Sequence, residues 1–137
     1  MEENENLSFL KIVILIYAIV ALVYGLCFLI APDFLVNMSG GEPVFHGWLR
    51  WAGGICVALG IGSLMVMRKP KNQGIFVTTI ALGSLLAGLA MVFAWINLEE
   101  GANVWFTALP AILLLVISGL FWWSRQNAKD ILYSKQE

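Results

Sequence analysis

Residues 12–32 read IVILIYAIVALVYGLCFLIAP, a run of 21 residues without a charge between Lys11 and Asp33. A helix that crosses the hydrocarbon core of a bilayer needs about 20 consecutive apolar residues. A strand of a membrane barrel would alternate apolar and polar residues over about ten positions, and the stretch Ile12–Val23 shows no such alternation. The run therefore predicts a membrane-spanning helix.

Three further uncharged runs follow along the chain. They contain 17, 27 and 24 residues, and they lie between Arg50 and Arg68, Lys71 and Glu99, and Glu100 and Arg125. The shortest run is long enough if its helix begins near Gly47 and the Arg50 side chain extends back to the interface. We therefore predict an all-α, four-helix transmembrane bundle, a single integral membrane domain over residues 1–137, with spans of about 7–30, 47–67, 74–98 and 104–124.

The composition agrees with a membrane protein. Apolar residues make up 60% of the chain and charged residues 12%, whereas a soluble domain has about 45–50% and roughly 25%. The net charge of −1 lacks the basic footprint of a nucleic-acid-binding protein. We therefore expect membrane lipids around the protein and no nucleic-acid partner.

The basic residues predict the orientation of the spans. Seven of the eight fall on one side of the membrane and Arg50 falls on the other; the seven are Lys11, Arg68, Lys69, Lys71, Arg125, Lys129 and Lys135. Cytoplasmic loops carry an excess of lysine and arginine. We therefore expect both termini in the cytoplasm of a bacterium and a multi-pass protein of the inner membrane.

Small residues at a spacing of four mark close helix contacts in membranes, where backbones approach each other. The second span carries Gly54, Ala58 and Gly62, and the third carries two such pairs, Gly83 with Ala87 and Ser84 with Gly88. We expect these spans at the centre of the bundle, or of a homo-oligomer or larger membrane complex. The spacing does not distinguish contacts within one chain from contacts between chains.

Between the first two spans, Pro32 and Asp33 are typical of a helix start. We expect a short helix there, lying on the outer surface with Phe34, Leu35 and Met38 toward lipid.

The ionisable groups converge at the outer side of the predicted bundle. His46 and Arg50 are four residues apart and share a helix face, and Asp33 ends the preceding span. One interpretation is an ion pair between Asp33 and Arg50 that fixes the first hairpin. The other is a binding site in which Arg50 holds an anion, a lipid headgroup or a lipid-like ligand and His46 carries a proton. Trp48 and Trp51 would line that site or lie at the headgroup level as part of an aromatic belt.

We expect no catalytic residues, no metal and no cofactor. The single histidine excludes a haem held by two histidines and makes a poor metal site with scattered carboxylates. Cys27 and Cys56 do not form the Cys-x-x-Cys motif of a thiol–disulfide enzyme. No carboxylate lies deep within a span, where a proton-coupled exporter needs one.

Two sequence segments resemble a known group of proteins. They are Tyr24-Gly25-Leu-x-x-Leu-Ile-Ala-Pro32 and Leu49-Arg50-Trp51-Ala-Gly53-Gly54, the latter continuing Ala58-Leu-Gly60-Ile-Gly62. The chain resembles small bacterial four-helix membrane proteins of the DoxX-like and domain-of-unknown-function group. Some DoxX-type members are similar to subunits of quinone-linked oxidoreductases, which implies a partner that carries the redox centre.

The leading hypothesis from the sequence is a non-enzymatic accessory or assembly subunit that self-associates or joins a larger membrane complex. A second hypothesis is a binder or carrier of a lipid-like or quinone-like molecule at an outer-leaflet site. A third is a subunit of a membrane redox enzyme.

Overall fold

The computed structural model describes residues 2–41, 47–98 and 100–133. These residues contain no strand and form the helices α1 (Glu2–Ile30), α2 (Pro32–Ser39), α3 (Gly47–Arg68), α4 (Gly74–Ile96), α5 (Val104–Asn127) and α6 (Lys129–Leu132). The helices α1, α3, α4 and α5 are long and apolar enough to cross a membrane. The predicted all-α bundle with four membrane-spanning helices is therefore confirmed, and the protein is a multi-pass membrane protein.

Local signals explain several helix ends. α5 begins at Val104 because the Asn103 side chain accepts a hydrogen bond from the backbone N–H of Trp105 at 3.1 Å, which caps the helix. α2 has Pro32 and Asp33 in its first turn, so the predicted short helix is confirmed. α4 ends at Ile96, two residues before the end predicted for the third span.

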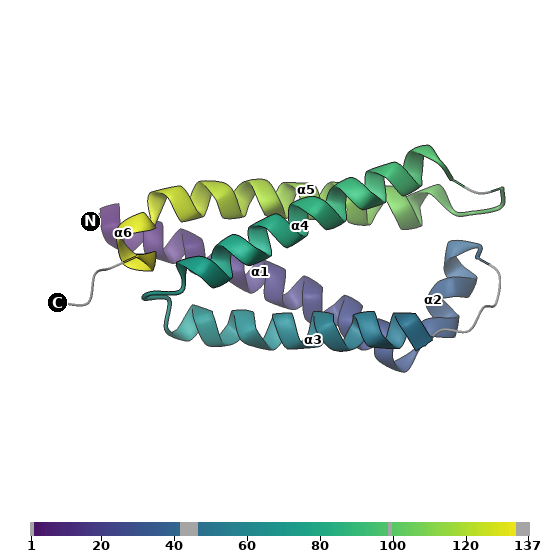
Figure 1. Ribbon diagram of the computed structural model, residues 1–137, viewed down its shortest axis with the longest axis horizontal. Coiled ribbons are helices and arrows are strands. Elements are labelled where there is room, and N and C mark those ends of the chain that lie inside the picture. Colours follow the sequence, from purple (N-terminus) through teal and green to yellow (C-terminus); the bar gives the residue numbers. More distant parts are fainter. Residues whose placement is uncertain (1, 42–46, 99, 134–137) are drawn as a thin grey trace.

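The four long helices form two antiparallel hairpins, α1 with α3 and α4 with α5, which meet along α1 and α5 (Figure 1). One end of the molecule carries both termini, α6 and the loop between α3 and α4, and we call it the terminal end. The opposite end carries α2 and the loop between α4 and α5, and we call it the far end.

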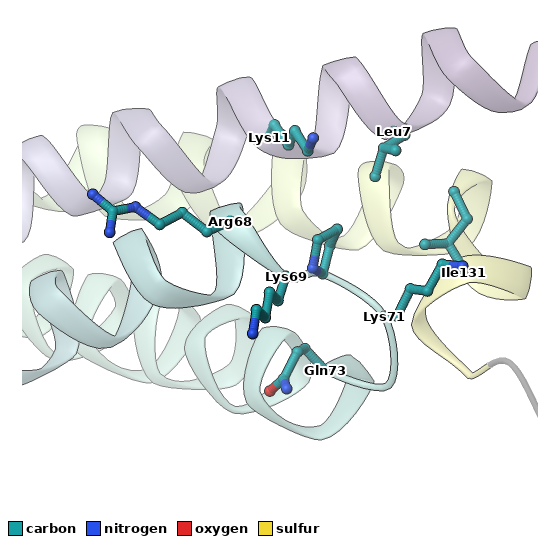
Figure 2. A pocket seen from close by; sticks show the side chains of 8 residues that line it. Leu7, Lys11, Arg68, Lys69, Lys71, Gln73 and Ile131 are labelled. Carbon is teal, nitrogen blue, oxygen red and sulfur yellow. The ribbon is translucent and has the colours of Figure 1, made fainter. Parts of the chain in front are cut away.

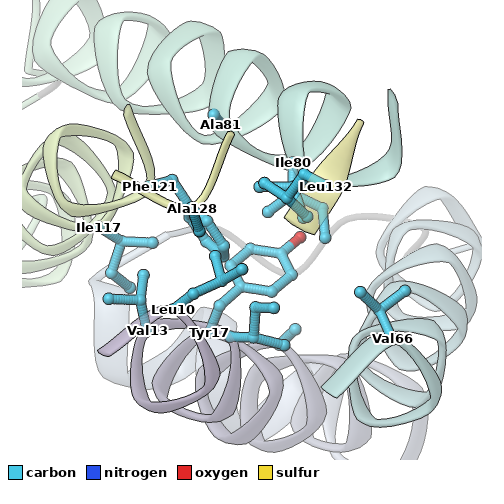
Figure 3. Packing of buried hydrophobic residues seen from close by; sticks show 13 residues of the cluster. Leu10, Val13, Tyr17, Val66, Ile80, Ala81, Ile117, Phe121, Ala128 and Leu132 are labelled. Carbon is cyan, nitrogen blue, oxygen red and sulfur yellow. The ribbon is translucent and has the colours of Figure 1, made fainter. Parts of the chain in front are cut away.

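The buried core lies among α1, α4, α5 and α6, as Figure 3 shows. At its centre the rings of Tyr17 and Phe121 meet edge to face with their centroids 5.6 Å apart. From α3, the buried cluster takes Val66. This corrects the expectation that the second and third spans form the centre of the bundle, because α1 and α5 occupy that place. The other buried members are Leu10, Val13, Ile14, Ala21, Val77, Ile80, Ala81, Ile117, Ala128 and Leu132.

Glycines bring the backbones of α1 and α3 into direct contact. A Cβ added at Gly53 would lie 2.8 Å from the carbonyl oxygen of Gly25 and 2.9 Å from the backbone nitrogen of Leu29. A Cβ added at Gly25 would lie 2.8 Å from the backbone nitrogen of Val57. All three distances are too short for a Cβ at the present helix separation, so the contact requires glycine in both helices.

α4 and α5 pack through a second set of small residues. Gly88 faces Leu115, whose side chain would lie 2.9 Å from an added Cβ. The hydroxyl of Ser118 donates to the carbonyl oxygen of Ala81 at 3.0 Å, which is a hydrogen bond between the two helices. Ser84 is buried on the same side of α4, and its hydroxyl has no hydrogen-bond partner among the described residues. Two of the predicted packing residues, Ser84 and Gly88, therefore lie buried within the chain.

The short helix α2 connects the two hairpins at the far end (Figure 1). It follows α1 directly, and beyond it the backbone N–H of Asn103, just before α5, donates to the carbonyl oxygen of Ser39 at 2.8 Å. Gly40 ends α2 with a φ of +75°, and its Cα faces the carbonyl oxygen of Gly101 so closely that no Cβ fits. Glycine is the residue that tolerates both constraints.

α3 and α4 touch near the terminal end and diverge toward the far end (Figure 1). Gly62 meets the ring of Phe76, 3.0 Å from an added Cβ. Farther along, a Cβ at Gly54 or Gly83 would meet nothing within 4 Å, and Ala58 and Ala87 are exposed. These four predicted packing residues therefore make no close helix contact within the described chain. For them, the prediction remains only for contacts between chains.

Candidate functional site

Arg50, the centre of the predicted outer site, caps a helix in the structure. Its Nη1 donates to the carbonyl oxygen of Leu29 at 2.9 Å. Leu29 lies in the last turn of α1, where carbonyl groups have no partner within the helix. A guanidinium also stabilises the negative end of the helix dipole. Arg50 therefore ties the start of α3 to the end of α1.

The other residues of the predicted outer cluster lie around this contact. Asp33 is exposed in the first turn of α2, where a carboxylate is favourable. Trp48 and Trp51 are 62% and 71% exposed, as expected of residues at the headgroup level. His46 lies outside the described residues. The described members of this cluster line neither of the two cavities at the terminal end.

The larger of these cavities has a volume of about 500 Å³. Figure 2 shows its lining residues, which come from α1, the end of α3, the loop between α3 and α4, and α6. Four of them are basic, namely Lys11, Arg68, Lys69 and Lys71. The others are Leu7, Pro70, Gln73 and Ile131, so the cavity combines positive charge with apolar walls. We call it the basic pocket.

The electrostatics of the basic pocket favour an anion. Within the described ranges 2–41, 47–98 and 100–133, none of its four cations forms an ion pair or a side-chain hydrogen bond. Gln73 precedes the first turn of α4 and makes no capping hydrogen bond from its side chain. The positive end of the α4 dipole therefore lies beside the pocket and adds to the charge of the side chains.

The loop that carries two of these cations, Lys69 and Lys71, is hydrogen-bonded to α6. Asn72 adopts a φ of +60°, a left-handed conformation that asparagine tolerates better than most residues. Its backbone N–H donates to the carbonyl oxygen of Ile131 at 3.4 Å, and that of Gln73 donates to Pro70 at 3.3 Å. α6 therefore holds the loop in place from the other side of the pocket.

Tyr133, just after α6, completes this attachment. Its ring covers Gly74 so closely that a Cβ there would collide with the ring. The hydroxyl of Thr78 donates to the carbonyl oxygen of Gly74 at 2.6 Å and lies 3.2 Å from the Tyr133 hydroxyl. Arg125 donates to the Tyr133 oxygen through two nitrogens, at 3.2 and 3.1 Å.

These neighbours change the acidity of the phenol. The hydroxyl of Thr78 and then the guanidinium of Arg125 hold the pKa of Tyr133 below its usual value, and partial burial opposes the shift. The guanidinium also stacks on the ring of Trp122, 5.2 Å from its centroid. Thr78, Arg125 and Tyr133 therefore form a polar cluster at the membrane boundary, which we call the terminal clamp.

The basic residues predicted the orientation of the chain from the sequence, but not that four of them line a pocket. Three basic residues within 68–71, directly before a helix start, are a signal that could have indicated an anion site. The contribution of Lys11 and Ile131 carries no such signal, because it depends on how α1 and α6 meet the loop. The role of Tyr133 is equally absent from any local pattern.

Comparisons with known proteins give one similarity. The chain is 29% identical over 117 residues to a glycerol-3-phosphate acyltransferase of Thermosynechococcus vestitus, and the match covers 76% of this chain and 50% of that protein. The chain thus spans about half the length of the curated relative it matches. No family model matches the chain, and no solved structure gives a significant match.

Proposed function

We propose that the protein is a small, non-enzymatic subunit of a bacterial inner membrane that associates with a second copy of itself through α3. The observation that carries this proposal is the exposed small-residue face at Gly54 and Ala58. Lipid tails give helices no hydrophobic reason to associate, so close contact between backbones depends on such residues. The proposal includes no cofactor and no catalytic step.

The glycines of α3 serve two different faces. Gly53 and Gly60 face α1 and are buried. Gly54 and Ala58 are exposed, and a Cβ at Gly54 would meet no atom within 4 Å. The contact within the chain therefore leaves a second small-residue face of α3 without a neighbouring helix in the described residues.

A pair of identical faces suits a symmetric dimer. In a two-fold interface each copy contributes the same patch, so Gly54 of one copy would lie near Ala58 of the other. Gly83 and Ala87 of α4 are also exposed and lie on the same side of their helix as Phe76, which meets α3 at Gly62. Small residues therefore lie on both helices where α3 and α4 diverge, which lets the backbone of a partner helix approach closely.

Replacement of Gly54 by leucine tests the proposal. Gly54→Leu fills the proposed interface, and its Cβ meets no atom of the chain within 4 Å, so we expect the dimer to become a monomer in native mass spectrometry from mild detergent. Gly119→Leu is the matched control, because a Cβ at Gly119 on α5 also meets nothing within 4 Å. A monomeric parent protein, or a Gly54→Leu dimer as abundant as that of Gly119→Leu, would refute the proposal.

The orientation is part of the same proposal. The basic residues of the terminal end support a cytoplasmic location for that end. A C-terminal alkaline phosphatase fusion, which is active only outside the cytoplasm, should be inactive, and a fusion after Gly41 should be active. The opposite pattern would reverse the orientation.

Two other functions are less well supported. Arg50 does not favour a lipid-like or quinone-like ligand at the far end, because its guanidinium is bonded to the carbonyl oxygen of Leu29. The acyltransferase named above is similar at 29% identity and twice as long as the matching region, so its activity is not part of this proposal.

A further inference from the structure

We propose that the basic pocket binds a phosphate group, and that its source is the headgroup of an anionic phospholipid in the leaflet at the terminal end. This inference does not depend on self-association, because the pocket lies within one chain and away from Gly54 and Ala58.

Four positive charges meet in the basic pocket. Lys11 comes from α1, Arg68 from the last turn of α3, and Lys69 and Lys71 from the loop, yet all four line one cavity. Like charges that line one cavity repel each other, and a bound anion removes that repulsion. Since no carboxylate of the described residues pairs with any of them, an external anion is the partner that the site lacks.

The lining of the basic pocket suits a phosphate group. A phosphate accepts several charge-assisted hydrogen bonds at once, and arginine and lysine are its usual protein partners. Gln73, the residue before α4, lines the pocket, so the positive end of that helix, which favours an anion, lies beside it. A volume of about 500 Å³ exceeds what a bare ion needs and suits a larger headgroup.

The basic pocket lies at the level of the lipid headgroups. α3 ends at Arg68 and α4 begins at Gly74, so the pocket lies where both spans leave the hydrocarbon region. Leu7, Pro70 and Ile131 form its apolar walls beside the cations. An amphiphile with a phosphate next to an apolar chain matches this lining better than a fully solvated ion does. Basic pockets between transmembrane helices bind lipid headgroups in this way.

The pocket is also preorganised. The bond from Asn72 to Ile131 fixes the loop, and Tyr133 holds the start of α4 against α6. A cation whose backbone is already fixed loses less conformational freedom when the anion binds.

The test measures retention of phosphatidylglycerol by native mass spectrometry as this lipid is titrated into the full-length protein in mild detergent. Removing one basic residue near a membrane surface costs roughly a fivefold loss of affinity. We expect such a loss for Lys11→Gln and for Lys71→Gln. Lys129→Gln is the matched control, because Lys129 is a terminal-end lysine that does not line the pocket, and its affinity should be unchanged.

A second variant separates a pocket from a charged surface. Leu7→Trp narrows the cavity and leaves the net charge unchanged, so it should weaken retention if the lipid enters the pocket. Equal affinity losses for Lys11→Gln and Lys129→Gln, or unchanged affinity in Leu7→Trp, would overturn the proposal. The same spectra report the oligomeric state, so loss of the dimer and loss of the lipid are recorded separately.

Two further arms identify the source of the phosphate. Phosphatidylcholine, which has no net charge, should be retained less than phosphatidylglycerol. Excess glycerol 3-phosphate or inorganic phosphate should not displace the bound phosphatidylglycerol. Displacement by these soluble compounds would keep the phosphate site and overturn the lipid as its source.

Discussion

Two neighbouring glycines of α3 give a sharp test of how the first hairpin is packed. Gly53→Ala places a Cβ 2.8 Å from the carbonyl oxygen of Gly25, whereas Gly54→Ala places one in open space. Ordinary contacts at a Cβ are 3.4–4 Å, so α1 and α3 must separate by about half an ångström. Misfits of this kind cost about 1–3 kcal/mol.

The two variants share one helix, one substitution and one change in helix propensity, so the propensity term cancels in the comparison. We expect Gly53→Ala to be less stable than Gly54→Ala by about 2 kcal/mol, roughly thirtyfold in the unfolding equilibrium constant. The assay is unfolding in mixed micelles with rising dodecyl sulfate, followed by circular dichroism. Equal stability, or a more stable Gly53→Ala, would show that the backbones of α1 and α3 do not touch at this point.

A double variant checks the mechanism. Gly25→Ala enters the same contact from α1, with its Cβ 2.8 Å from the backbone nitrogen of Val57. Once the helices have separated to accommodate one methyl group, the second fits without further separation. The double variant should therefore lose less stability than the sum of the losses of Gly25→Ala and Gly53→Ala. Full additivity would mean that the two glycines act independently.

Three other predictions concern polar side chains. Ser118→Ala should lower the stability by about 0.6 kcal/mol, because it removes a hydrogen bond between α4 and α5. Ser84→Ala should be neutral or stabilising, because the buried Ser84 hydroxyl has no partner among the described residues. The same unfolding assay in mixed micelles distinguishes the two variants, and a larger loss of stability for Ser84→Ala would contradict the assignment. Arg50→Gln should lower the stability by about 1 kcal/mol through loss of the bond to Leu29, and the helicity of the folded protein should remain; unchanged stability would show that the bond is not needed. Tyr133 should form phenolate, followed by its absorbance at 295 nm, at a lower pH than a free tyrosine does, and Tyr133→Phe should remove this phase of the titration. Because the pKa of Tyr133 is lowered in the folded protein, its ionisation adds stability as the pH rises through that pKa and none at neutral pH. A titration phase that survives in Tyr133→Phe belongs to another group.

The positions of the long helices were predictable because a bilayer imposes a simple rule on the chain. A charged residue is costly in hydrocarbon, so uncharged runs of sufficient length mark the spans. Their contacts were less predictable. Gly53 and Gly54 are neighbours in the sequence but point about 100° apart around α3, so that only Gly53 meets α1, and the spacing of four selected Gly54. Which side faces α1 depends on how the whole hairpin rotates, and no local pattern specifies that.

The candidate sites show a similar division. The sequence brought Arg50 and Asp33 together as opposite charges, but a helix end supplied Arg50 with a backbone carbonyl instead. Such partners are invisible in a sequence, because every residue has a carbonyl group and only the fold shows which ones are free. The basic pocket depends on α6, a helix of four residues whose packing against the loop has no periodic signature.

The length of α2 determines how far apart the two hairpins lie at the far end. Eight helical residues span about 12 Å, whereas the axes of packed helices are about 8–10 Å apart. α2 follows α1 directly, and its last residue, Ser39, accepts a hydrogen bond from Asn103, the residue before α5. Its length exceeds the distance between the axes of two packed helices. The separation of the hairpins at the far end is therefore set by a count of residues. Removal of one turn of α2 would let α3 close onto α4, and Gly54 and Gly83 would then be covered by their own chain instead of remaining open to a second one.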